Sequence, residues 1–107
     1  MRLYHPNIGS AIRKRRIENT PALKGSPLLE GLLRRSKRGE TGTYDAIRYI
    51  ERGDIYGTTS PKGVRQHRKE RLHFLAVYLD EIGFDPADPL VKEIRKIDDR
   101  FVYPPQD

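Results

Sequence analysis

Apolar side chains recur at helical spacing in three stretches of the chain, with short glycine- and proline-containing segments between them. In the longest stretch, residues 61–82, the apolar stripe begins only at Leu72. Residues 44–52 and 89–101 carry shorter stripes of the same kind. The sets that we expect to pack together in a core are Leu72, Leu75, Leu79 and Ile82; Ile47 and Ile50; and Leu90, Ile94 and Ile97.

Three of the expected helices begin with a capping residue followed by proline. Proline is favoured at the first helical position because its missing N–H needs no partner there. These starts are Ser26–Pro27, Ser60–Pro61 and Asp88–Pro89. Glycine is favoured just after a helix end, so the first of these helices is expected to end at Gly39 and the second at Gly83.

Two further helices are predicted from weaker patterns. Thr43 can cap a helix over residues 44–52, which Gly53 would end. A short helix over residues 10–17 is expected to stop before Pro21, since a residue that precedes proline avoids the helical region.

No stretch shows the alternation of a strand over a convincing length, and the pattern therefore predicts a mainly α fold. We expect a small domain of three to four helices over about residues 43–103. As a division of the chain, residues 27–107 would form this helical domain with an extended C-terminal tail. Residues 1–26 would form a basic, partly extended N-terminal arm and connector, and residues 1–25 are expected to have no independent fold and to become ordered only on a partner.

The placement of charge changes this picture more than the net charge of +6 does. Residues 1–38 hold ten lysines and arginines but only two acidic residues, whereas residues 39–107 hold eleven against thirteen. The whole positive excess therefore lies in the first third of the chain. Such asymmetry is typical of a basic segment that binds a polyanion beside a nearly neutral folded body.

The longest predicted helix has its charges in the order that the helix dipole disfavours. Cations gather near its start and the carboxylates of Asp80 and Glu81 near its end. Cations beside free backbone N–H groups can bind phosphate. The unfavourable position in the helix dipole costs little at exposed sites, so these residues could also form a face that is only solvated. Asp80 and Glu81 are expected to pair with a cation from residues 34–38, or with Arg95 or Lys96.

Clusters of arginine and lysine neutralise phosphates without reading sequence, and three such clusters are candidate nucleic-acid contacts. The first lies in the arm, the second at the end of the helix that begins at Pro27, and the third at the start of the longest helix. Their residues are Arg13, Lys14, Arg15 and Arg16; Arg34, Arg35, Lys37 and Arg38; and Lys62, Arg65, Arg68 and Lys69.

Other chemistries find little support in the sequence. The chain has no cysteine, and His67, Glu70 and His73 offer neighbouring pairs on a helix without a third metal ligand. No serine lies in a sequence motif typical of a catalytic nucleophile, and no glycine-rich loop matches a phosphate-binding motif. We therefore expect no catalysis, no cofactor, no metal and no small-molecule substrate.

The expected location follows from the same absences. No apolar run approaches the roughly 18 residues that span a bilayer, so no membrane partner is expected. The predicted location is intracellular, in the cytoplasm, an organelle matrix or a virus particle.

Three functions fit these observations. The first is a non-enzymatic structural subunit of a nucleoprotein assembly such as a ribosome or virus particle, with nucleic acid, RNA or DNA, and neighbouring protein subunits as partners. The second is a small DNA-binding regulator of the helix-turn-helix type. The third is a protein–protein adaptor whose cations meet acidic partners. The sequence leaves all three open.

Overall fold

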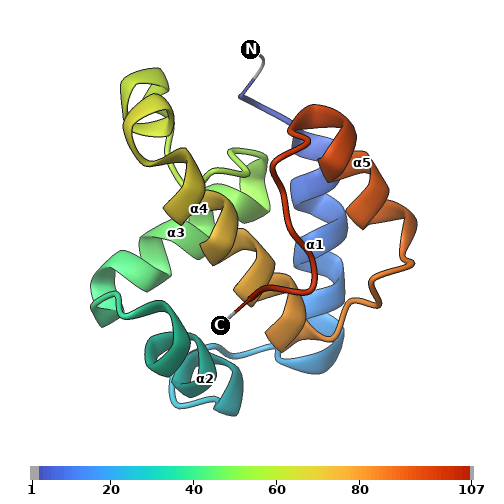
Figure 1. Cartoon of the computed structure of the whole chain (residues 1–107). Helices are drawn as coiled ribbons and strands as arrows, with labels where there is room; N and C mark the ends of the chain where they lie inside the picture. The colour runs from blue at the N-terminus through green and yellow to red at the C-terminus, as the bar shows by residue number, and fades with distance from the viewer. Residues whose placement is uncertain (1–2, 107) are drawn as a thin grey trace.

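The structure is a computed structural model that describes residues 3–106, and its architecture is mainly helical (Figure 1). Outside the helices, Tyr4 and Asp54 form an isolated antiparallel bridge. The helices are α1 (Pro6–Asn19), α2 (Pro27–Ser36), α3 (Glu40–Arg52), α4 (Pro61–Ile82) and α5 (Pro89–Ile97). The prediction of a mainly α fold is confirmed. Among the described residues, no helix is long and apolar enough to cross a membrane.

The three proline-led helix starts are confirmed. The Oγ of Ser26 accepts from the Leu29 amide at 3.1 Å, and the carboxylate of Asp88 accepts from the Leu90 amide at 2.9 Å. Ser60 caps α4 in the same way. Gly83 ends α4 in the left-handed conformation, at φ 95°.

Several predicted helix boundaries were wrong: the helix expected over residues 10–17 spans Pro6–Asn19, and both boundaries at the turn between α2 and α3 differ. Helix α2 ends at Ser36 and not at Gly39, because Lys37 adopts the left-handed conformation at φ 58°. Helix α3 begins at Glu40, ahead of the expected start. Thr43 is fully buried inside that helix, where its amide donates to the carbonyl of Gly39 at 3.0 Å, so it does not act as the cap.

Helix α4 runs through the middle of the molecule and forms the centre of the core (Figure 1). All residues from Phe74 to Leu79 are buried, so this part of the helix is covered on every side. Leu75 and Leu79 are completely buried in one cluster with Ile47 and Ile94, as the apolar stripes predicted.

The N-terminal segment is not the partly extended arm that its charge suggested. Residues 6–19 form helix α1, which packs along α3 and buries Ile8 and Ile12 in the common core. The approach is close at Gly9, where an added Cβ would lie 2.5 Å from the amide nitrogen of Gly53. The segment from Pro6 to Asn19 is therefore helical and packs against the core.

A buried ion pair fixes α1 to the two helices beside it. The guanidinium of Arg16 donates to both carboxylate oxygens of Glu51, at 2.9 and 2.8 Å. The hydroxyl of Tyr78, on α4, donates to the same carboxylate at 2.5 Å. The Glu51 carboxylate raises the pKa of Arg16, while burial raises the pKa of Tyr78. Arg16 and Glu51 therefore join α1, α3 and α4 at one point.

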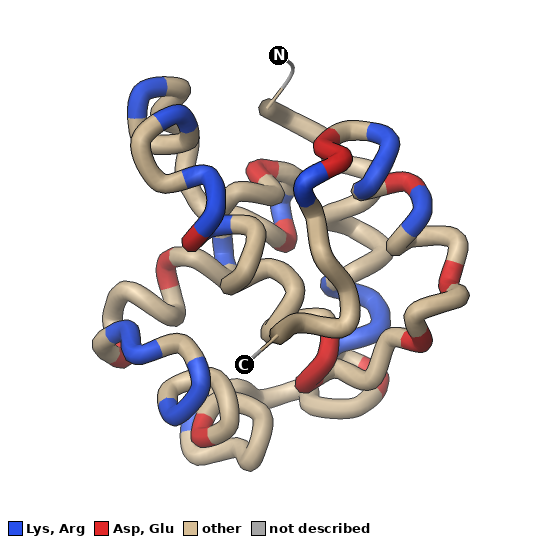
Figure 2. The backbone as a smooth tube through the Cα atoms, viewed as in Figure 1, with Lys and Arg blue, Asp and Glu red and all other residues tan. Residues whose placement is uncertain are grey.

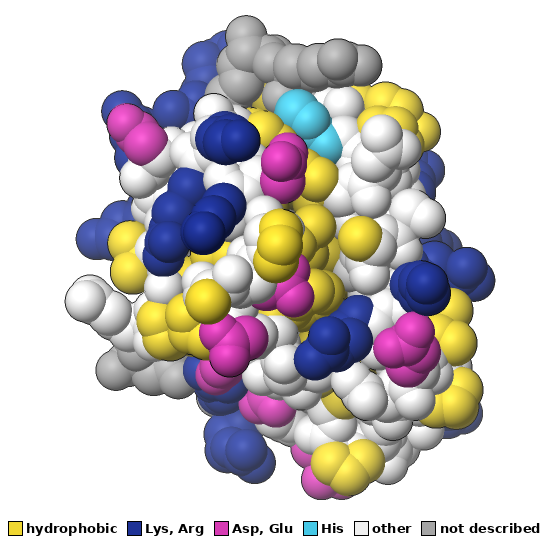
Figure 3. Space-filling model, turned by 90° about the vertical axis from the view of Figure 1, so that its right-hand side faces the viewer, with side chains coloured by type: hydrophobic (Ala, Val, Ile, Leu, Met, Phe, Trp, Pro, Cys, Tyr) yellow, Lys and Arg dark blue, Asp and Glu magenta, His cyan; other side chains and the backbone are white. Residues whose placement is uncertain are grey.

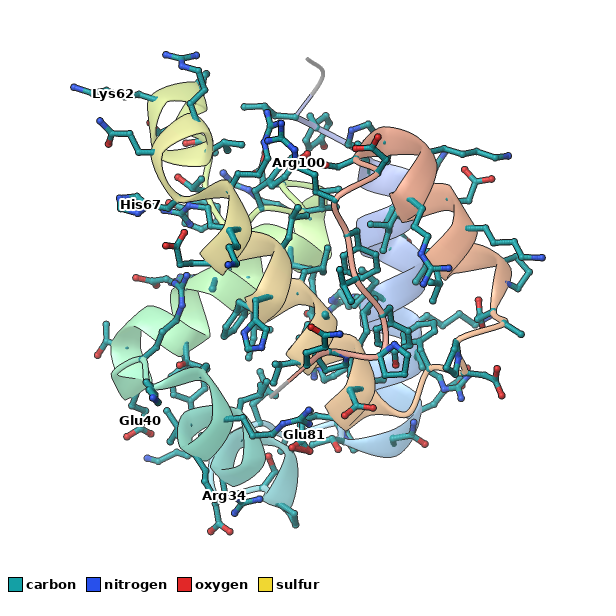
Figure 4. The ribbon with its side chains drawn as sticks, viewed as in Figure 1. Arg34, Glu40, Lys62, His67, Glu81 and Arg100 are labelled. Carbon is teal, nitrogen blue, oxygen red and sulfur yellow. The ribbon has the colours of Figure 1, made fainter. Side chains whose placement is uncertain are left out.

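The two acidic residues near the end of α4 find the cation that was expected from residues 34–38. Arg35 lies 2.9 Å from the carboxylate of Asp80 and 3.3 Å from that of Glu81. Figure 4 shows Glu81 between α2 and the end of α4. This pairing fixes α2 against α4 and offsets the unfavourable dipole position of the carboxylates.

The C-terminal residues lie against the body of the molecule. Phe101 and Tyr103 are buried, and the hydroxyl of Tyr103 donates to the carbonyl of Phe84 at 2.6 Å. Arg95 of α5 donates to the carbonyl of Tyr103 at 2.8 Å. The segment therefore runs in front of the helices, beside α4, before the chain ends (Figure 1).

Replacing Arg16 with alanine should lower the free energy of unfolding by about 3–5 kcal/mol, because it leaves the buried Glu51 carboxylate with only the largely exposed Arg13 guanidinium, 3.9 Å away, as a cation. Urea unfolding measures this change. The exposed neighbour Lys14 is the matched control, and Lys14→Ala should change stability by less than about 0.5 kcal/mol. An Arg16→Ala cost below about 1 kcal/mol would mean that this ion pair contributes little to the fold.

Candidate nucleic-acid interface

The start of α4 projects from the body of the molecule and is bent relative to the rest of the helix (Figure 1). The bend lies at His67, whose backbone angles of φ −129° and ψ 29° are not helical. Lys62 and Arg65 are exposed on the projecting turns, and Figure 4 shows Lys62 pointing away from the molecule. These turns therefore present cations to solvent.

The projecting turns are nevertheless anchored to the core. Val64 is completely buried, although the apolar stripe of this helix begins only at Leu72 in the sequence. Arg71 donates to the carbonyls of Tyr56 and Gly57, at 3.2 and 3.4 Å, and so holds the preceding connection against α4. These contacts hold the backbone that carries the cations at the start of α4 against the core.

The turn between α2 and α3 brings a second group of cations beside α4. The guanidinium of Arg38 lies over the ring of Phe74, 4.8 Å from its centroid. Burial and the nearby positive charge of Arg71 lower the pKa of Arg38. The positive charges of Arg38 and Arg71 therefore lie close to each other in this region.

Two grooves meet on the exposed side of α4. The first, called the α2 groove, has a volume of about 360 Å³. Ser36 and Arg38 line one side of it, and Phe74 of α4 lines the other. The second, called the tail groove, has a volume of about 500 Å³ and lies between α4 and the C-terminal segment. Arg100 and Val102 line it from the C-terminal segment. The two grooves share Lys69 and His73. Their size is that of sites that hold small ligands or parts of larger ones.

A buried hydrogen bond positions one further arginine of the tail groove. The Asp98 carboxylate accepts from the Tyr56 hydroxyl at 2.9 Å and lies 3.6 Å from the Arg68 guanidinium. Burial is the main cause that raises the pKa of Tyr56 to about 12, and the bond to Asp98 and the charge of that residue add to it. Asp98 thus holds Arg68 at the groove wall and neutralises part of its charge.

The structure separates the twelve predicted contact residues into different roles. Arg16 and Arg35 are structural, because each is paired with carboxylates inside the molecule. Arg15 lies over the ring of Phe84 and donates to the carbonyl of Gly83. It therefore sits at the opposite end of α4 from the projecting turns.

The other predicted residues lie at or near the surface. Arg13, whose side chain is 61% exposed, and Lys14 are on α1, while Arg34 and Lys37 lie at the end of α2. Figure 2 shows lysines and arginines gathered in the first turns of α4 and around the turn between α2 and α3. The residues that the structure brings to the grooves are Arg38, Arg68 and Lys69.

Arg100 is a groove residue that the sequence did not point to. It lies in the segment expected to leave the domain as a tail, and Figure 4 shows it at the start of that segment, on the side of α4. No local pattern indicates its position, because only the docking of Phe101 and Tyr103 brings it there.

The face that carries α5 has a different character. Figure 3 shows basic and acidic side chains interspersed over it, without a broad region of one sign. Within residues 3–106, no group of three or more histidine or acidic side chains is placed to hold a metal ion.

Comparisons of the chain with protein-family models, with curated proteins and with solved structures give no match.

The burial of Tyr56, together with its bond to Asp98, raises the pKa of this tyrosine and so makes stability depend on pH. The unfolded chain loses the tyrosine proton near pH 10, whereas the folded protein keeps it until about pH 12. Unfolding is therefore favoured as pH rises through this window, and Tyr56 should account for a loss of up to about 2–3 kcal/mol. Urea unfolding from about pH 9 to about pH 12 measures it.

Tyr56→Phe should make the fall with pH shallower than in the wild type, and the exposed Tyr4→Phe, the matched control, should keep the wild-type curve. Parallel curves for Tyr56→Phe and the wild type would contradict the claim that Tyr56 causes this loss of stability at high pH.

Proposed function

We propose that this protein binds nucleic acid through the phosphate backbone, as a small non-enzymatic component of a nucleoprotein assembly. The interface is the basic face, defined as the projecting turns of α4, the turn between α2 and α3, and the two grooves. One observation carries the proposal: Arg38, Lys69 and Arg100 come from three separate segments and line two grooves that meet. A row of cations suits the repeated charges of a nucleic-acid backbone.

The partners of the other cations support this choice of face. Elsewhere, arginines are occupied by carboxylates of the same chain, as in Arg16–Glu51, Arg35–Asp80 and Arg52–Asp54. Lys62, Arg65 and Lys69 are exposed. Phosphates that meet these side chains need not displace a buried ion pair.

A DNA-binding regulator is the second candidate, and the projecting turns of α4 favour it. Arg65 and Gln66 are exposed there, and both residue types can hydrogen-bond to base edges in a major groove. The connection from α3 to α4, residues 53–60, is longer than the usual turn of a helix-turn-helix motif. A preference for one DNA sequence that disappears in Gln66→Ala would favour this candidate over backbone binding.

Replacing Lys62, Arg65 and Lys69 together with glutamine should weaken binding to unrelated nucleic-acid sequences by similar factors, because phosphate contacts carry no sequence information. The slope of log affinity against log salt should fall in magnitude by about 0.7–0.9 for each phosphate that the variant no longer neutralises. Fluorescence anisotropy with labelled oligonucleotides over a salt series measures both effects.

The matched control replaces three exposed lysines on other segments, Lys14, Lys24 and Lys92, with glutamine. It removes the same charge and should lower affinity much less. Equal reductions in the two triple variants would show that binding follows net charge and not this face. Failure of the wild type to bind near physiological salt would reject nucleic acid and favour an acidic protein partner.

A further inference from the structure

The tail groove differs from the rest of the basic face because its lining is both cationic and apolar. Lys69 and Arg100 are exposed cations on its opposite walls. Leu72, Val102 and Pro105 supply apolar surface between them. Within the described part of the chain, no acidic side chain lines this groove, whereas Glu70 lines the α2 groove.

Val102 is the residue that makes this lining unusual. Its side chain is 54% exposed, although its neighbours Phe101 and Tyr103 are buried. The hydrogen bonds of Tyr103 to Phe84 and Arg95 hold Val102 at the groove in a fixed position. A large apolar side chain beside cations is suited to an occupant that has an apolar surface and negative charge close together.

We infer that the tail groove takes an unpaired nucleotide, so that the protein binds single strands in preference to duplexes. A single strand presents phosphates for Lys69 and Arg100 and a base for the apolar floor. The guanidinium plane of Arg100 can also stack on a base. A duplex offers its phosphates to the same cations, but its bases are stacked inside, so the floor would stay without contact.

The two grooves together extend this match along a strand. Their linings share Lys69 and His73, and Arg38 in the α2 groove adds a cation to Lys69 and Arg100 of the tail groove. Such a row fits successive phosphates of one strand. This inference rests on the proposed backbone binding and adds the form of nucleic acid that is bound.

The test compares three labelled ligands with the same number of phosphates: an unstructured oligothymidylate, the same strand with abasic sites, and a duplex with that phosphate count. Anisotropy at one salt concentration should give affinity for the oligothymidylate about 5- to 150-fold above that for the abasic strand, the range for stacking of a base. The duplex should bind about as weakly as the abasic strand.

Two variants locate the effect. Val102→Glu places a negative charge in the tail groove, and Ala87→Glu adds the same charge at an exposed position in the loop before α5. Val102→Glu should reduce the preference for oligothymidylate over the abasic strand to about onefold, while Ala87→Glu should leave that ratio unchanged. Thermal unfolding should show both variants folded, because both positions are exposed.

The outcomes separate this inference from the proposed function. Equal affinity for oligothymidylate and the abasic strand would overturn base binding in the groove while backbone binding stands. Absence of binding to all three ligands would overturn both. Displacement of oligothymidylate by polyglutamate at a matched charge concentration would also overturn the inference, since it would show that the groove takes any acidic chain.

Discussion

The buried pair between Arg16 and Glu51 is the interaction on which the arrangement of the other elements depends. It joins α1 to α3, and the hydroxyl of Tyr78 adds the central helix α4 to the same carboxylate. An isolated charge buried at this depth would be strongly unfavourable, so each partner requires the other in place. Helix α1 thereby becomes part of the core, and the most basic stretch of the sequence loses its freedom as an arm.

The proposed interface accordingly lies on α4, the turn between α2 and α3 and the C-terminal segment, and not on the N-terminal segment. Internal partners occupy arginines on α1, α2 and α3, among them Arg16, Arg35 and Arg48. Lys69, Arg38 and Arg100 line two grooves that share Lys69 and His73, and further exposed cations lie on the projecting turns of α4. The net charge of the chain says little about the binding face, because the positions of the acidic partners decide which cations remain accessible.

Features with a local cause were predictable from the sequence, and features with a tertiary cause were not. The starts at Pro27, Pro61 and Pro89 were found because capping and the geometry of proline act within one helical turn. The length of helix α1 and its place in the core were not predicted, because Ile8 and Ile12 form only a narrow apolar stripe among cations. In addition, Glu51, the partner of Arg16, lies far along the chain. The same reason applies to the site: Arg38 and Lys69 were expected as cations, but their convergence with Arg100 depends on packing.

The most direct test of the account follows backbone amide chemical shifts during titration with a short single strand. If the basic face is the interface, the shifts should concentrate in residues 37–38, 62–74 and 100–106, and the exposed residues of α1 and α5 should change little. Shifts centred on Arg13 and Lys14, with α4 unaffected, would contradict the account and return the interface to the N-terminal segment.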